Sequence, residues 1–238
     1  MFSKIRNIIR KVLFPNTYSS EAFLNFLSKK GVSVGSNCII YSPNNTNIDI
    51  QRPEMLHIGN FCRITRGVTI LCHDYSMSVA RRKFHSFVGT AAETYIGDNV
   101  FIGMNATILM GTRIGNNCIV GAGAVVSGDF KDDSVIAGNP AKVICSIDGY
   151  YKKHLDRQYD SAKAYFFKLY ENKKRIPTVE EMGNAFAWMY LPRNKEAVEK
   201  YNRFFRLGGE SYEDVVDDFL CSKGMFESYD DFVKAVLR

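Results

Sequence analysis

A six-residue repeat runs through the middle of this 238-residue chain. An aliphatic side chain recurs at every sixth position, at Ile96, Ile102, Ile108, Ile114, Val120 and Val126. A second small or branched residue follows four places later, at Val100, Ala106, Thr112, Cys118 and Ala124. A period of six matches no α-helix. Because six is a multiple of two, the aliphatic residue and the residue four places later can both point to the same side of the chain, towards one interior. Glycine follows four of the six aliphatic residues, where we expect the chain to turn. The repeat predicts a β-solenoid.

The same repeat occurs earlier in the chain in a weaker form. Its aliphatic positions there are Val34, Ile40, Ile58, Ile64 and Ile70. Residues 44–53 interrupt it once. The 26 positions from Ile70 to Ile96 are not a multiple of six, so a second insertion lies between about residues 72 and 94. Since interruptions of a solenoid commonly carry function, we expect the functional loop there.

The two ends of the chain differ from the repeat. We predict an N-terminal helical segment over residues 1–30, the solenoid with its inserted loop over residues 31–147, and a C-terminal α-helical extension over residues 148–238. The extension holds 18 of the 31 aromatic residues. Thr178, Ser211 and Ser228 each precede an acidic residue by three positions, which is the pattern of a helix N-cap. We expect four or five short helices there, packed by aromatic side chains.

Charge and cysteine positions bear on the ligand and the compartment. Residues 1–147 hold 15 Lys and Arg against 9 Asp and Glu, which accounts for the whole net charge of +6. This excess suits an anionic, nucleotide-like ligand, with a solvated surface as the alternative. It is too small to indicate nucleic-acid binding. Cys38, Cys62 and Cys118 occupy interior positions of the repeat, as buried core residues do. No Cys/His cluster has zinc spacing. We therefore expect a reducing, cytoplasmic compartment and no metal.

Residues 1–14 form a basic, amphipathic segment in which five apolar residues lie near one face of a helix: Phe2, Ile5, Ile9, Val12 and Leu13. No apolar run approaches the ~20 residues that cross a bilayer, and no signal-peptide cleavage site follows. We favour a cap over an open end of the solenoid. Peripheral contact with a membrane surface is the alternative.

A closing motif gives the chain a family resemblance. The segment 136–144 reads IAGNPAKVI, and it follows a Gly-Ala-Gly-Ala hexad at residues 121–124. With the repeat and the inserted loop, it resembles the hexapeptide-repeat acyltransferases, in the branch of maltose, galactoside and xenobiotic O-acetyltransferases. The resemblance covers about residues 32–145. It implies a mainly β fold, a left-handed parallel β-helix, and a homotrimer that binds acetyl-CoA as co-substrate between neighbouring chains.

The resemblance also implies a catalytic histidine at the mouth of the inserted loop. The matching position is His73. The chemistry agrees, because a hydroxyl group is nearly inert at neutral pH and needs a base that titrates near pH 7. Asp74 and His85 are further candidates for the site. The alternatives are a polar surface residue for His73 and a turn residue for Asp74.

By the same resemblance, the acetyl-CoA site uses positions along the last turns of the solenoid. These are Gly103, Ala122, Gly123, Gly138, Asn139, Pro140 and Lys142. Residues with little or no side chain would admit the pantetheine arm, and Lys142 would pair with a CoA phosphate. Corner geometry is the alternative explanation for the glycines.

We therefore expect O-acetyl transfer to a sugar or polysaccharide hydroxyl, with His73 as general base, in polysaccharide biosynthesis. Acetylation of an antibiotic and N-acetylation of an amino-sugar nucleotide are alternatives. A metal-dependent hydratase similar to the γ-type carbonic anhydrases needs a close histidine pair, which the spacing of His57, His73 and His85 does not supply. A non-catalytic scaffold is a further class. The acceptor and the role of the extension are not assigned by the sequence.

Overall fold

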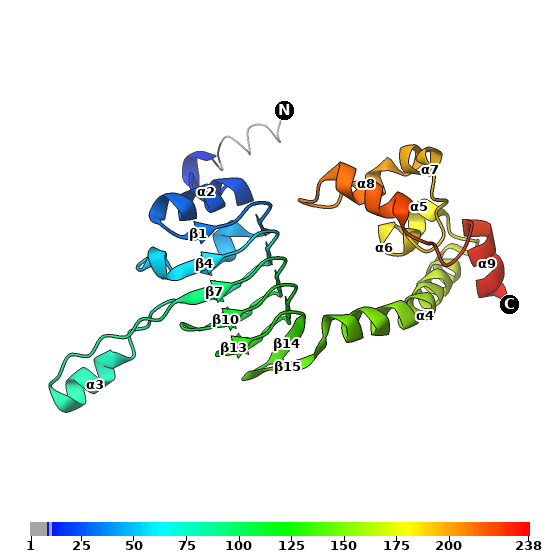
Figure 1. Cartoon of the computed structure of the whole chain (residues 1–238). Helices are drawn as coiled ribbons and strands as arrows, with labels where there is room; N and C mark the ends of the chain where they lie inside the picture. The colour runs from blue at the N-terminus through cyan, green and yellow to red at the C-terminus, as the bar shows by residue number, and fades with distance from the viewer. Residues whose placement is uncertain (1–8, 10) are drawn as a thin grey trace. The chain divides into compact units, whose positions relative to one another are not determined.

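The computed structural model describes residue 9 and residues 11–238, and the chain forms two compact units, residues 1–151 and 152–238. Most of the amphipathic segment 1–14, including Phe2 and Ile5, lies outside the described residues. Helix α2 (Ser20–Lys30) confirms a helix within the first 30 residues. Its Phe23 and Leu27 are buried in the core of the first unit. Helix α2 therefore covers the first turn of the coil (Figure 1).

The first unit is a coil of short strands that run in turn along three faces (Figure 1). The first face holds β1 (Ser33–Val34), β4 (Leu56–Ile58), β7 (Thr94–Ile96), β10 (Arg113–Ile114) and β13 (Asp129–Phe130). The second holds β2 (Ile39–Ile40), β5 (Arg63–Ile64), β8 (Phe101–Ile102), β11 (Ile119–Val120), β14 (Ser134–Gly138) and β15 (Ala141–Ser146). The third holds β3 (Asn47–Ile48), β6 (Thr69–Ile70), β9 (Thr107–Ile108) and β12 (Val125–Val126). Apart from the antiparallel β14–β15 hairpin, each strand pairs in parallel with the strand three places further on, so three strands complete one turn.

The inward positions of the repeat form the core of the coil. On the second face, the strand register aligns Ile40, Ile64, Ile102, Val120 and Ile136 in successive turns. All five side chains are buried, and each such side chain contributes about 1.5–3 kcal/mol. The predicted burial of the cysteines in the repeat is confirmed at Cys38, Cys62 and Cys118. Each turn of the coil is thus stabilised by the turns that stack on it.

The glycine after each strand is not the residue at which the chain turns, which corrects the expectation from the sequence. Asn99 and Asn117 have the left-handed conformation at these corners, each with φ 54°, and Asn tolerates this region. Their side chains link successive turns, since Asn99 Nδ2 donates to Asn117 Oδ1 at 3.0 Å. The glycines serve close stacking instead. A Cβ at Gly97 would lie 2.7 Å from the carbonyl carbon of Gly115 in the next turn.

Two interruptions leave the coil at the corner between its third and first faces. The first lies between β3 and β4, at residues 49–55, and contains the 3₁₀ helix η2 (Pro53–Met55). It begins later than the predicted range 44–53, because residues 47–48 form β3 and pair with β6. A second 3₁₀ helix, η1 (Pro43–Asn45), precedes β3. The second interruption follows β6 and forms an arm that carries helix α3 (Met77–Phe84) and projects from the coil (Figure 1). A backbone bridge between His73 and Ala91 closes the base of the arm. Both interruptions therefore leave the coil beside each other in successive turns.

The second unit is helical. Its elements are α4 (Ile147–Lys173), which begins in the first unit, α5 (Val179–Met182), α6 (Asn184–Ala187), α7 (Lys195–Lys200), η3 (Asn202–Phe205), α8 (Tyr212–Cys221) and α9 (Tyr229–Leu237). The expectation of short helices alone is wrong, because α4 has 27 residues. The predicted N-caps are confirmed at Thr178, Ser211 and Ser228. Phe166, Phe205 and Phe232 lie in an aromatic core.

Within residues 9 and 11–238, no helix combines the length and the apolar character that crossing a bilayer requires.

Candidate active site

His73 lies where the arm leaves the coil, three residues after β6. Its side chain is 22% exposed, and its Nδ1 forms a short hydrogen bond with Oδ2 of the Asp49 carboxylate. Asp49 comes directly after β3, and the register of β3 with β6 sets Ile48 opposite Ile70. The stacking of two turns therefore brings Asp49 and His73 together at the corner where both interruptions begin.

Asp49 is a buried, ionised carboxylate. Its side chain is only 3% exposed. Its Oδ1 accepts from the backbone N–H of Gln51 at 2.9 Å, and its Oδ2 also accepts from the backbone N–H of Cys72 at 3.1 Å. Burial raises the pKa of Asp49. Hydrogen bonds from Gln51, Cys72 and His73 lower it by more than burial raises it, so the pKa falls from the ordinary 3.8 to about 2.

The charge on Asp49 fixes the tautomer of the histidine. An ionised carboxylate can only accept hydrogen bonds, so in the neutral imidazole of His73 the proton is on Nδ1 and the lone pair is on Nε2. The nitrogen that carries the lone pair is then the one not held by Asp49. This arrangement prepares His73 to act as a base through Nε2.

Cys72 brings a third potential metal ligand to this corner. Ligand atoms of Asp49, Cys72 and His73 lie within 4.8 Å of one another, a grouping that the sequence spacing did not predict. Burial, and then the Asp49 carboxylate, raise the pKa of the Cys72 thiol to about 12, so it stays protonated and donates to the carbonyl oxygen of Arg52 at 3.3 Å. Both oxygens of Asp49 already accept from N–H groups. These hydrogen bonds suit the positioning of His73 better than they suit a cation.

Asp74 shapes the base of the arm. Its Oδ1 accepts from the backbone N–H of Ser76 at 3.0 Å, from the Ser76 hydroxyl at 2.9 Å and from the Thr90 hydroxyl at 3.3 Å. The hydrogen bonds from Ser76, followed by the one from Thr90, lower the pKa of Asp74. Asp74 therefore keeps a negative charge and links the outgoing and returning segments of the arm through its hydrogen bond with Thr90.

His85 and His57 lie apart from this centre. His85 is exposed, ends α3 in the left-handed conformation with φ 52°, and does not border the pocket beside His73. His57 pairs through Nε2 with Glu93 at 2.9 Å on the first face. In the part of the chain that the structure describes, no cluster of potential metal ligands joins either histidine to His73.

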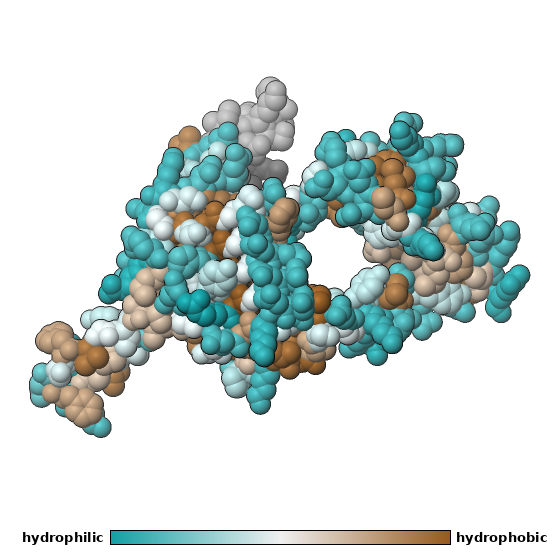
Figure 2. All heavy atoms as spheres, in the orientation of Figure 1, coloured by the Kyte–Doolittle hydropathy of each residue, from teal (hydrophilic) through white to brown (hydrophobic). Residues whose placement is uncertain are grey.

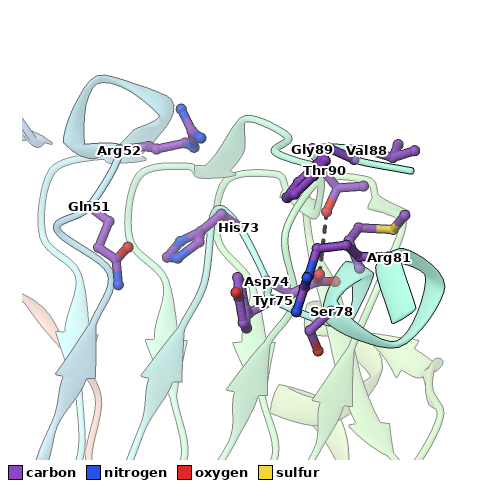
Figure 3. Close-up of a pocket in the computed structure, with 12 residues that line it drawn as sticks. Gln51, Arg52, His73, Asp74, Tyr75, Ser78, Arg81, Val88, Gly89 and Thr90 are labelled. Carbon is purple, nitrogen blue, oxygen red and sulfur yellow. Dashed lines mark hydrogen bonds between the residues drawn. The ribbon is translucent and has the colours of Figure 1, made fainter. Parts of the chain in front are cut away.

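A pocket of about 390 Å³ opens beside His73 (Figure 3). Gln51 and Arg52 border it from the first interruption, and Tyr75, Arg81 and Phe87 border it from the arm. The arm also exposes apolar side chains, since Val79, Phe84 and Phe87 are 71%, 65% and 86% exposed (Figure 2). The pocket thus combines a base, two guanidinium groups and aromatic surface.

Comparison with known proteins identifies the family. The family described as bacterial transferase hexapeptide (six repeats) matches residues 93–128. Protein CapG of Staphylococcus aureus is 40% identical over 150 residues, 63% of this chain and 83% of the relative. The putative lipopolysaccharide biosynthesis O-acetyl transferase WbbJ of Escherichia coli K12 is 34% identical over 133 residues, 50% of this chain and 68% of the relative. The chain belongs to the hexapeptide-repeat acyltransferases. Among solved structures, a maltose O-acetyltransferase from Clostridium difficile 630 is 25% identical, with a TM-score of 0.39, over 53% of this chain and 75% of that one.

In this hexapeptide-repeat acyltransferase, two of the expected cofactor residues share a groove. Gly103 and Ala122 line a hollow of about 520 Å³ together with Tyr41, Phe101 and other residues. Stacking of the coil already requires the glycine, because a Cβ at Gly103 would lie 2.5 Å from the backbone nitrogen of Ala122. The absence of a side chain there is therefore explained without a ligand, and the groove itself is the feature that a ligand would use.

The remaining expected cofactor residues lie elsewhere on the coil. Gly123 has a left-handed φ of 69° and open space where a Cβ would be. The others form or follow the turn of the β14–β15 hairpin: Gly138, Asn139, Pro140 and Lys142. The Asn139–Pro140 peptide bond is cis, and Lys142 is exposed. None of these residues borders the His73 pocket or the Gly103 groove.

The sequence predicted His73 as a site residue but gave no indication of Asp49, which hydrogen-bonds to it, or of Arg52, which borders the same pocket. Both lie in the first interruption, between β3 and β4, whereas the sequence pattern indicated function only for the longer interruption. A signal was present, because both interruptions begin directly after a strand of the third face. Residues that follow neighbouring parallel strands meet at one edge. Applying that rule to the weak early repeat would have paired Asp49 with the loop that holds His73.

Proposed function

We propose that this acyltransferase moves an acetyl group from acetyl-CoA to a hydroxyl group of a sugar or polysaccharide, with His73 as general base. The observation that carries the proposal is the hydrogen bond between His73 Nδ1 and the ionised Asp49, at the border of an open pocket. It gives the chain an oriented base where a hydroxyl group can reach it. A non-catalytic scaffold has no need of a histidine that a buried carboxylate orients at the border of a pocket.

The reaction is a direct transfer. Acetyl-CoA supplies the activated thioester. His73 Nε2 takes the proton of the acceptor hydroxyl as its oxygen attacks the thioester carbonyl carbon, and then returns the proton to the departing sulfur. Asp49 holds the ring in position and stabilises the imidazolium that forms between the two transfers, as an acid–base partner does in hydrolytic triads.

The groove lined by Gly103 and Ala122 suits the cofactor. Its Tyr41, Phe101 and Met104 offer apolar surface to the pantetheine chain, and Arg66 at the same groove can pair with a phosphate. We extend the proposal to the β14–β15 hairpin, where Gly138, Asn139, Pro140 and Lys142 would contact the distal part of CoA.

The two parts of the site lie on opposite edges of the third face. The groove borders the corner that leads into β9, whereas His73 follows β6 at the far edge. A homotrimer of left-handed β-helices, as the family resemblance implies, would set the groove of one chain against His73 of its neighbour. This arrangement is part of the proposal.

Polysaccharide biosynthesis in the cytoplasm is the proposed setting. The similarity to a putative lipopolysaccharide biosynthesis O-acetyl transferase supports the substrate class. The six cysteines are all free thiols, as in a reducing compartment. Antibiotic O-acetylation and N-acetylation of an amino-sugar nucleotide use the same base and are decided by the acceptor panel described next.

The test measures CoA release from acetyl-CoA with sugars, glycan fragments, amino sugars and hydroxylated antibiotics. We expect turnover with a sugar hydroxyl acceptor, lowered by roughly 10²–10⁴-fold in His73→Ala. His85→Ala is the matched control, because His85 lies outside the pocket, and it should retain full activity. Stabilisation of His73→Ala by CoA in a thermal-shift titration would show that the variant is folded.

Two results would overturn the proposal. Full activity of His73→Ala would remove the histidine from the reaction. No turnover with any acceptor, together with no stabilisation by CoA, would reject acetyl transfer itself.

A further inference from the structure

Two arginines border the His73 pocket from different parts of the chain. Arg52 comes from the interruption after β3, and Arg81 comes from α3 on the arm (Figure 3). Among residues 9 and 11–238, neither guanidinium forms an ion pair with a carboxylate, whereas Arg113 on the coil pairs with Glu93. The Arg81 guanidinium lies over the ring of Phe87, 5.7 Å from the ring centroid.

The carboxylates near the pocket are engaged elsewhere. Asp49 is held by His73 and by backbone N–H groups behind the pocket. Asp74 is held by Ser76 and Thr90. Asp74 itself borders the pocket and keeps its charge, but within the described residues it forms no ion pair with Arg52 or Arg81. Arginine stays charged at any physiological pH, so the pocket holds two guanidinium groups against one carboxylate, and both guanidinium groups are available to an anionic ligand.

A guanidinium group matches a carboxylate or a phosphate with paired, charge-assisted hydrogen bonds. The exposed rings of Tyr75 and Phe87, which also border the pocket, offer apolar surface to the carbon face of a sugar ring. The pocket therefore contains complementary groups for the anion, the ring and the reacting hydroxyl of one ligand.

We infer that the acceptor is an acidic saccharide, which carries a carboxylate or a phosphate close to the hydroxyl that His73 deprotonates. Arg52 and Arg81 bind that anion from the two sides of the pocket. This inference rests on the proposed function, because it names the substrate class of the same site. The CoA phosphates are not the expected partners, since the Gly103 groove has its own cation, Arg66.

The test compares matched acceptors on the wild-type protein. Methyl glucoside, methyl glucuronide and methyl glucoside 6-phosphate share a sugar ring and an anomeric methyl group, and they carry a hydroxyl, a carboxylate and a phosphate group, respectively, at the C6 end. Because a hydrogen bond to a charged group is worth roughly 10–100-fold in affinity, we expect kcat/KM for one of the anionic acceptors to exceed that for the neutral one by about this factor. Comparison of the uronate with the phosphate then shows which anion the site binds.

Three variants test whether the preference for anionic acceptors arises from the arginines of the pocket. Arg52→Gln and Arg81→Gln should each remove most of the preference for the anion, by lowering kcat/KM for the anionic acceptor towards the value for the neutral one. Arg82→Gln is the matched control, because it removes the same charge from the next residue of α3, which is exposed and does not border the pocket. It should behave as the wild type.

Binding of glucuronate and of inorganic phosphate, followed by titration calorimetry, separates this inference from the proposed function. Loss of anion binding in the Arg52→Gln/Arg81→Gln double variant, with binding retained in Arg82→Gln, supports the acidic ligand even if no acetyl transfer is found. If all variants bind the two anions as the wild type does, the acidic acceptor is overturned. It is also overturned if the wild type turns over normally but prefers neutral acceptors. Both results leave the proposal of acetyl transfer in place. Loss of turnover with all acceptors alike in Arg52→Gln and Arg81→Gln would also overturn the acidic acceptor.

Discussion

Replacing Asp49 with asparagine tests the central pair of the site. An asparagine side chain has one acceptor oxygen and one donor nitrogen, whereas both oxygens of Asp49 accept hydrogen bonds. If the amide nitrogen faces His73, it meets the donor Nδ1 and favours the wrong tautomer. If the amide oxygen faces His73, the N–H of Gln51 loses its acceptor. Either orientation breaks at least one of the hydrogen bonds that the Asp49 carboxylate accepts.

The cost to stability follows from the pKa of Asp49. Its fall from 3.8 to about 2 on folding corresponds to about 2 kcal/mol, at about 1.4 kcal/mol per pKa unit. Because the folded-state pKa is the lower one, this stability is present above about pH 4 and is lost as the pH falls towards 2. The difference in unfolding free energy between wild type and Asp49→Asn should therefore be about 2 kcal/mol at pH 7 and shrink below pH 4.

Urea unfolding at fixed protein concentration measures the stability difference, and CoA release measures activity. We expect kcat to fall by roughly 10²–10⁴-fold in the folded variant, because the base loses its orienting partner. Activity within threefold of wild type would refute the tautomer argument. An unchanged stability difference from pH 7 to pH 3 would refute the assignment of the ionised carboxylate.

Other substitutions test the fold around the site. Tyr190→Phe should leave stability unchanged or raise it by about 1 kcal/mol in urea unfolding, because the buried Tyr190 hydroxyl has no hydrogen-bond partner among the described residues; a loss would reveal a partner. Gly103→Ala should lower the unfolding free energy by roughly 3 kcal/mol, because a Cβ there would lie 2.5 Å from backbone. Gly123→Ala should lower it by only roughly 1 kcal/mol, because its Cβ would meet nothing within 4 Å and only the left-handed φ opposes alanine. Equal losses in the two variants would contradict the stacking argument. Glu181→Gln should lower the melting temperature of the helical unit at pH 7, because the bond to Arg175 lowers the pKa of Glu181 to about 2. That difference from wild type should vanish as the pH falls from about 4 towards 2, and a difference that persists would contradict the ion pair.

Local pattern predicted the parts of the fold that depend on neighbours in sequence. The six-residue spacing predicted which residues face the interior, and Ile40, Ile64 and Ile102 stack as the repeat requires. The helix caps at Thr178 and Ser228 followed from spacings of three residues. The corners were assigned wrongly, because a glycine after a strand fits a turn and a close approach equally well. The long helix α4 was missed, because it has few buried residues to mark its period.

The sequence by itself determined the coil and the position of one histidine at the loop mouth, since both follow from short-range periodicity and a motif. It could not pair His73 with Asp49, which lies 24 residues away, or bring Arg52 and Arg81 to one pocket. Those contacts depend on the register between turns of the coil and on two insertions that leave it at the same corner. Register is set by the burial of the whole stack of aliphatic side chains, so only the tertiary structure decides which residues meet at the site.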